Sequence, residues 1–200
     1  MRADLVLAPG LWMPDAAMHI LGARLARHGY RVRIFGYRGR APYEANLEAL
    51  ARFANGSSFF VGHSLGGVLI LDMLNRHPEV EAKGAVLLGS PVRGCLAGRR
   101  LGGAGLGRWM MGACRERWDE RPARWTRRAP LGVVAGTTPF GLGRVVGRLP
   151  GPNDGVVRVD ETTVEGMTGR ALVAQGHSML IVSGRVGELV HRFCSAGSFE

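Results

Sequence analysis

The chain has 200 residues, 46% of them hydrophobic, and a formal net charge of +10 at pH 7. This length suffices for one well-buried domain and is short for two, and no apolar run approaches the ~20 residues needed to cross a bilayer. Composition thus excludes a membrane-spanning protein and predicts one soluble domain over 1–200.

The first part of the chain alternates short apolar runs with helical patterns. In chain order these predict a strand over 5–8, a helix that Asp15 caps and Gly29 ends, a strand over 32–35, a helix over 43–54 and a strand over 58–61. The glycine-rich segment 62–67 follows the last of these strands without a gap. A helix over 68–76 comes next and ends before Pro78.

The second part predicts strands over 85–88, 132–135 and 171–174, and a closing helix that contains 186–193. The strands are apolar throughout, as buried parallel strands are. Strands that alternate with helices imply right-handed crossovers. We therefore expect an α/β fold with a mostly parallel sheet of about six strands and helices on both faces.

The segment Gly62-His63-Ser64-Leu65-Gly66 matches the Gly-x-Ser-x-Gly pattern of a serine nucleophile on a strand-to-helix turn. The pattern can arise by chance in a chain with 31 glycines. Here the preceding strand and the following helix supply the context that the chemistry needs, because helix N-terminal amides help to hold the developing negative charge. Ser64 is therefore the expected nucleophile, and the alternative is a glycine-rich turn with an incidental serine.

A serine hydroxyl needs a base, and in such sheets the order along the chain is serine, acid, histidine. Of the six histidines, only His177 and His191 lie far enough beyond Ser64 to leave room for an acid. His177 follows the strand over 171–174 and precedes a helix, which puts it at the sheet edge where Ser64 lies. His191 belongs to the last helix and is expected on the surface. His63 is expected only to support the turn.

The acid is expected at Asp154, in a Gly-Pro-Asn-Asp-Gly turn that follows the fifth strand. A loop carboxylate there can reach His177 and hold it in the productive tautomer. The alternatives are a merely turn-forming Asp154, with Asp160 or Glu161 as the acid.

The tetrahedral intermediate needs hydrogen-bond donors for its oxyanion. Backbone N–H groups of Leu65, after the nucleophile, and of Leu11, in the loop after the first strand, are the expected donors. Trp12 stands beside Leu11 and is expected to contact the substrate.

Residues 92–128 fit neither the strand nor the helix pattern. They hold ten arginines against three acidic residues. They follow the strand over 85–88, whose carboxyl end lies beside that of the nucleophile strand, so we expect a cap that offers Trp109 and Met110 to the substrate while its arginines stay at the water surface. The alternative is a solvated basic excursion with one packed helix.

The positive charge also suggests anionic partners. Most of the excess lies in this one segment, which lacks interleaved base-stacking aromatics, so we expect no nucleic acid and at most a weak association with an anionic membrane surface. The amino terminus shows no charged leader or cleavage site, and the three cysteines are widely spaced, so we expect a reduced cytoplasmic protein without a metal site.

Three segments together resemble the α/β-hydrolase superfamily, particularly its compact bacterial lipases and esterases with a Gly-His-Ser-Leu-Gly-Gly turn. They are 62–67, 152–157 and 176–180. In similar proteins these segments hold the nucleophile, the acid and the base, which the resemblance places on Ser64, Asp154 and His177. It covers nearly the whole chain outside 92–128. The two leading antiparallel strands of larger members are missing, and the oxyanion loop begins Pro-Gly where such lipases often have His-Gly.

The resemblance implies an enzyme that cleaves small carboxylic esters with short to medium acyl chains through an acyl-enzyme on Ser64, without metal or cofactor. A thioesterase or an acyltransferase would use the same triad. A non-catalytic binding protein on the hydrolase scaffold is the alternative from another class. The sequence does not predict the oligomeric state.

Overall fold

A computed structural model describes residues 3–39, 41–54, 56–103, 117–140 and 147–200 of the chain. Within these ranges the strands are β1 (Asp4–Ala8), β2 (Arg31–Ile34), β3 (Ser58–His63), β4 (Ala82–Leu88), β5 (Leu131–Gly136) and β6 (Gly169–Val173). They form one six-stranded sheet in the order β2-β1-β3-β4-β5-β6, and every neighbouring pair is parallel. The predicted sheet is confirmed.

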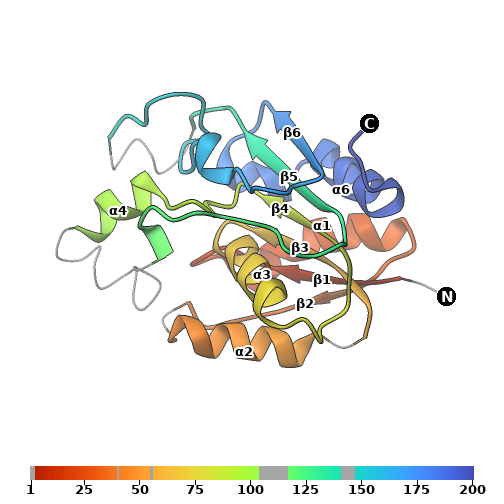
Figure 1. Ribbon diagram of the computed structural model, residues 1–200. Coiled ribbons are helices and arrows are strands. Elements are labelled where there is room, and N and C mark those ends of the chain that lie inside the picture. Colours follow the sequence, from red (N-terminus) through yellow and green to blue (C-terminus); the bar gives the residue numbers. More distant parts are fainter. Residues whose placement is uncertain (1–2, 40, 55, 104–116, 141–146) are drawn as a thin grey trace.

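The described helices are α1 (Asp15–Arg27), α2 (Tyr43–Phe53), α3 (Leu65–Arg76), α4 (Leu96–Gly102) and α6 (Gly184–Ala196), with short 3-10 turns η3 (Asp160–Thr162) and η4 (His177–Ile181). Helices α2 and α3 cover one face of the sheet, and α1 and α6 cover the other (Figure 1). Side chains alternate along each strand, so Phe60 of β3 packs under α3 while Val61 packs under α1 and α6. The core therefore has two layers, one on each side of the sheet.

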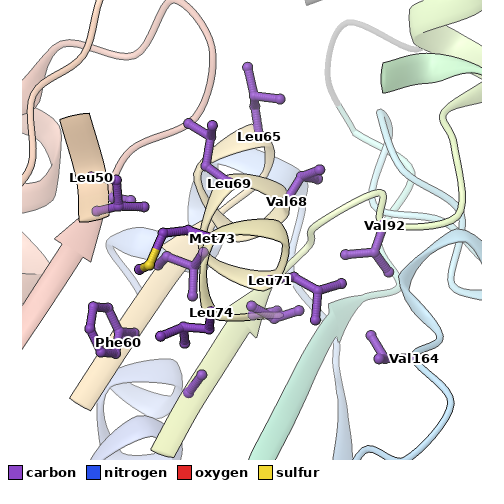
Figure 2. Close-up of a cluster of buried hydrophobic side chains, with 14 of the residues drawn as sticks. Leu50, Phe60, Leu65, Val68, Leu69, Leu71, Met73, Leu74, Val92 and Val164 are labelled. Carbon is purple, nitrogen blue, oxygen red and sulfur yellow. The ribbon is translucent and has the colours of Figure 1, made fainter. Parts of the chain in front are cut away.

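Helix α3 is more deeply buried than α2, the other helix on the same face of the sheet. Figure 2 shows Leu65, Leu69 and Met73 along α3, in the same hydrophobic cluster as Leu50 of α2 and Phe60 of β3. Each of these side chains is at most 1% exposed. Because α3 begins directly after Ser64, this packing fixes the turn that carries the serine.

Two predicted helix starts are wrong. Helix α3 begins at Leu65, three residues before the predicted start. Glycine is a poor helix former, so Gly66 and Gly67 were not expected inside the helix, but their close packing against neighbouring atoms holds them there. Helix α1 begins at Asp15, and Pro14 rather than Asp15 occupies the N-cap position. Gly29, with φ of 90°, follows the end of α1 as predicted.

The structure describes both ends of the segment 92–128 but not 104–116, so the expected contacts of Trp109 and Met110 lie outside the described residues. The outgoing end forms α4. The returning end runs along α3, where Arg121 donates two hydrogen bonds to Asp72 and Arg127 donates to the carbonyl oxygens of Leu74 and Val80.

These contacts correct the expectation of arginines at the water surface for Arg117, Arg121 and Arg127, whereas four others of this segment are exposed as expected: Arg93, Arg100, Arg124 and Arg128. The side chains of Arg117 and Arg121 are only 20% and 22% exposed. They pair with a carboxylate on α3, and Arg127 binds carbonyl oxygens at the end of that helix, which have no partner inside the helix. None of the helices in the described ranges has the length and apolar character that crossing a bilayer requires.

Candidate active site

Ser64 occupies a sharp turn between β3 and α3. Its backbone, with φ of 52° and ψ of −123°, lies in a region that non-glycine residues rarely adopt and that costs about 1–3 kcal/mol. The surrounding contacts hold it there: its N–H donates to the carbonyl oxygen of Leu88 (2.9 Å), and its own carbonyl accepts from Gly67 N–H (3.1 Å). Such a strained backbone points the serine side chain away from both elements at the carboxyl edge of the sheet.

Two glycines make this turn possible. A Cβ on Gly62 would overlap the backbone of Gly67, and a Cβ on Gly66 would overlap the carbonyl oxygen of Ala8 in β1. Strand and helix can therefore approach each other closely only because these positions lack a side chain.

Asp154 and His177 form a buried pair at the same edge. Asp154 Oδ2 lies 2.7 Å from His177 Nδ1, and Asp154 Oδ1 accepts from the N–H groups of Val156 (3.0 Å) and Val157 (2.7 Å). Asp154 is 1% exposed. Because a carboxylate only accepts, Nδ1 must carry the proton, which leaves the lone pair of the neutral ring on Nε2.

The pair lies close to the serine turn. A Cβ on Gly89, directly after β4, would stand 3.0 Å from Asp154 Oδ2 and 3.2 Å from His177 Nδ1. His63, the residue before Ser64, packs its ring on the ring of His177 with 4.6 Å between centroids. The three residues predicted from the sequence are thus gathered at one edge.

The alternative residues have partners other than Ser64, Asp154 and His177. His191 stacks on His28 with 3.9 Å between ring centroids and lies 3.2 Å from Tyr30 Oη, so it is partly buried rather than fully solvated. Asp160 pairs with Arg158 and is exposed. Glu161 is buried and accepts from the N–H groups of Leu96 and Arg158.

Burial raises the pKa of Glu161, an effect that these hydrogen bonds oppose. Neither Asp160 nor Glu161 has a hydrogen bond to His177 in the described part of the chain. The carboxylate bonded to His177 there is that of Asp154.

The expected oxyanion donors stand on two backbone segments. Leu65 is the first residue of α3, where N–H groups have no partner within the helix. Leu11 lies in a turn closed by a hydrogen bond from Met13 N–H to the carbonyl oxygen of Gly10 (3.3 Å). Trp12 in this turn has φ of 60° and is 45% exposed. Apart from Ser64, it is the sole non-glycine residue of positive φ in the described ranges.

Sequence reasoning missed two exposed apolar side chains on the site loops. Phe140 is 71% exposed, and its carbonyl oxygen would lie 2.6 Å from a Cβ on Gly155 and 3.0 Å from a Cβ on Gly176, which places it between the loop of Asp154 and the loop of His177. Met179, two residues after His177, is 50% exposed. The available signals in the sequence were the positions of Phe140 soon after the predicted fifth strand and of Met179 soon after His177.

The described residues contain no group of three or more His, Cys, Asp or Glu side chains suited to a metal ion.

Comparisons with known proteins identify the fold of the chain. No protein-family model and no curated protein matches it. Many solved structures do match the chain.

A pyrethroid hydrolase from Sphingobium faniae matches with a TM-score of 0.60 and 16% identity, covering 98% of each chain. A carboxylesterase of the thaumarchaeon Nitrososphaera gargenis has a TM-score of 0.66 and 12% identity over 97% of this chain and 90% of that one. An extracellular α/β-hydrolase from a Paenibacillus species has a TM-score of 0.58 and 13% identity over 96% of this chain and 98% of that one. With its parallel sheet and its serine turn after β3, the chain thus has the fold of the α/β-hydrolase superfamily.

Proposed function

We propose that this protein is a serine hydrolase that cleaves carboxylic esters, with Ser64 as nucleophile, His177 as base and Asp154 as the acid that orients the base. The observation that carries the proposal is the buried Asp154–His177 hydrogen bond of 2.7 Å at the edge where Ser64 holds its strained backbone. The solved structures with this fold that are named as esterases and carboxylesterases support the same reaction class.

The reaction begins when His177 Nε2 takes the proton of the Ser64 hydroxyl and Ser64 Oγ attacks the ester carbonyl carbon. The oxyanion that forms accepts hydrogen bonds from the N–H groups of Leu65 and Leu11. Protonated His177 then gives its proton to the leaving alcohol, and the C–O bond breaks to leave an acyl-enzyme. Asp154 stabilises the imidazolium of both half-reactions without taking its proton.

Water completes the cycle. His177 removes a proton from a water molecule, which attacks the acyl carbonyl, and the collapse of the second tetrahedral intermediate returns the proton to Ser64 Oγ and releases the acid. A thioester could replace the ester as substrate, and an acceptor alcohol could replace the attacking water. Both reactions would use the same groups.

An apolar rim around the site supports an ester with a hydrophobic group. We define this rim as Trp12, Phe140 and Met179, three large exposed side chains that follow β1, β5 and β6 in the chain, Met179 within η4. Exposed apolar side chains gathered on site loops offer surface that an acyl or alcohol group can bury. We include Trp109 and Met110 of the segment 92–128 as further contacts from a cap, and a weak attraction to anionic membrane surfaces through its arginines.

The test is turnover of p-nitrophenyl esters with acyl chains from two to sixteen carbons by the wild type and by Ser64→Ala. We expect turnover that is highest for short and medium chains and a loss of about four to six orders of magnitude in the variant. A Ser64→Ala protein that keeps a tenth of the wild-type turnover would rule out the proposed nucleophile.

A further inference from the structure

His63 is a buried histidine that the triad does not use. It ends β3, it is 1% exposed, and its Nε2 lies 3.0 Å from the carbonyl oxygen of His177. A carbonyl oxygen only accepts hydrogen bonds, so Nε2 must carry the proton and donate it. The ring is therefore held in one tautomer, with its lone pair on Nδ1.

In this tautomer the other ring nitrogen, Nδ1, destabilises the folded state. His63 Nδ1 is buried and has no hydrogen-bond partner within the described part of the chain. A Cβ on Gly10 would stand 3.0 Å from it, so the oxyanion loop packs directly over this atom. A buried acceptor without a partner destabilises a fold, and an apolar side chain of similar shape would avoid that penalty. The presence of a histidine at this buried position therefore needs an explanation. The hydrogen bond that its Nε2–H donates provides one.

The hydrogen bond from His63 Nε2 holds one of the two peptide groups that flank the side chain of His177. The N–H of His177 donates to the carbonyl oxygen of Asp154 (2.9 Å), and the carbonyl oxygen of His177 accepts from His63 Nε2. The backbone of the base is thus fixed on both sides, by the acid residue and by the residue that precedes the nucleophile. Since His63 and Ser64 are adjacent in the chain, the Nε2–H bond ties the nucleophile turn to the base turn.

His63 is an uncharged neighbour of the His177 ring. Burial, and next the nearby His177, lowers the pKa of His63 to about 3, so the ring is neutral at neutral pH. A cation 4.6 Å from the His177 ring would oppose the imidazolium that forms in each half-reaction. A neutral donor holds the base without that repulsion.

We propose that His63 is a positioning residue that fixes the base relative to the nucleophile through its Nε2–H bond to the carbonyl oxygen of His177. The inference rests on the proposed function, because it assigns His63 to the same reaction. Displacement of a catalytic group by about 1 Å can lower turnover by about 10²-fold while substrate binding is kept.

The test compares three variants of the full chain. In His63→Gln the side-chain amide nitrogen can reach the place of Nε2 and donate the same bond. In His63→Asn the amide is one carbon shorter and reaches only the place of Nδ1. His63→Phe keeps a ring but has no donor. Kinetic constants for p-nitrophenyl acetate and thermal unfolding midpoints are measured for each, with His191→Gln as a histidine control away from the site.

We expect kcat to fall about 10- to 100-fold in His63→Asn and His63→Phe with KM changed less than about twofold, and His63→Gln to stay within about threefold of the wild type. His63→Asn and His63→Gln are compared as folded proteins by their unfolding midpoints, so the test stands even if His63→Phe does not fold. Equal kcat in the Gln and Asn variants, or a loss confined to KM, would overturn the inference.

A spectroscopic readout is independent of turnover. In protein labelled with ¹⁵N-histidine, NMR at pH 7 should show the signals of a neutral ring protonated at Nε2 that are absent from His63→Gln, which assigns them to His63. A proton on Nδ1 of that ring would overturn the inference. A wild type without any turnover would overturn the proposed function and the inference together, whereas an active wild type with equal Gln and Asn variants overturns the inference alone.

Discussion

Asp154→Asn removes the charge of the buried carboxylate while it keeps the size of the side chain. In the wild type, Oδ1 accepts two backbone N–H bonds and Oδ2 accepts from His177 Nδ1. The amide of asparagine has a single oxygen, which the N–H groups of Val156 and Val157 occupy, so its NH₂ group must face His177. That donor favours the tautomer with the proton on Nε2, which cannot take the proton of Ser64.

The loss follows from the tautomer and from the imidazolium that the charge no longer stabilises. In a triad these two effects together lower turnover by about 10³- to 10⁴-fold, which is about 4 to 5.5 kcal/mol in the activation free energy. The protein should still fold, because both backbone N–H groups keep an acceptor.

The assay is kcat for p-nitrophenyl acetate across pH 6 to 9, and the matched control is Asp160→Asn. Asp160 is exposed and pairs with Arg158, so its variant should stay within about twofold of the wild type. The reasoning fails if Asp154→Asn keeps a tenth of the wild-type turnover, or if the control variant loses as much activity as Asp154→Asn.

Three further outcomes are expected. Gly10→Ala would put a Cβ 3.0 Å from both Ser64 Cβ and His63 Nδ1, so kcat should fall about tenfold, while Gly103→Ala, with its nearest contact at 3.5 Å, should match the wild type; equal kcat in the two variants would contradict this. In unfolding experiments, His63, with its folded pKa of about 3 below the unfolded value of about 6.5, contributes stability that is present above pH 6.5 and lost as the pH falls toward 3. The wild type should therefore lose about 2 kcal/mol more than His63→Gln between pH 7 and pH 5, and equal losses in urea titrations would refute the neutral buried ring. Replacing Phe140 and Met179 together by serine should raise KM for an octanoate ester several-fold more than KM for an acetate ester, and an unchanged ratio would remove both from the substrate site.

The sequence predicted the parts of the molecule whose signals are local. Each strand is a short apolar run, and the serine turn is set by glycines next to Ser64, so the sheet and the position of Ser64 at its edge followed without any long-range information. The order serine, acid, histidine selected Asp154 and His177. The structure brings these two together, while their catalytic roles stay predictions.

The parts that were wrong or missed depend on partners distant in sequence. Arg121 and Arg127 looked like a solvated charge run because Asp72 and the end of α3 are their partners only in the folded chain. The contact between His63 and the carbonyl oxygen of His177 spans 114 positions and has no pattern in the sequence. The cap expected over 92–128 stays a prediction, since its middle lies outside the described residues.

The most direct test of the central assignment is covalent labelling with a fluorophosphonate, followed by peptide mass mapping. The wild type should carry one adduct, on Ser64, and His177→Ala should label at least about 10³-fold more slowly because the hydroxyl then lacks its base. His191→Ala should label at the wild-type rate. A folded wild type that carries no adduct, or an adduct on another residue, would contradict the assignment of Ser64 as the nucleophile of this protein.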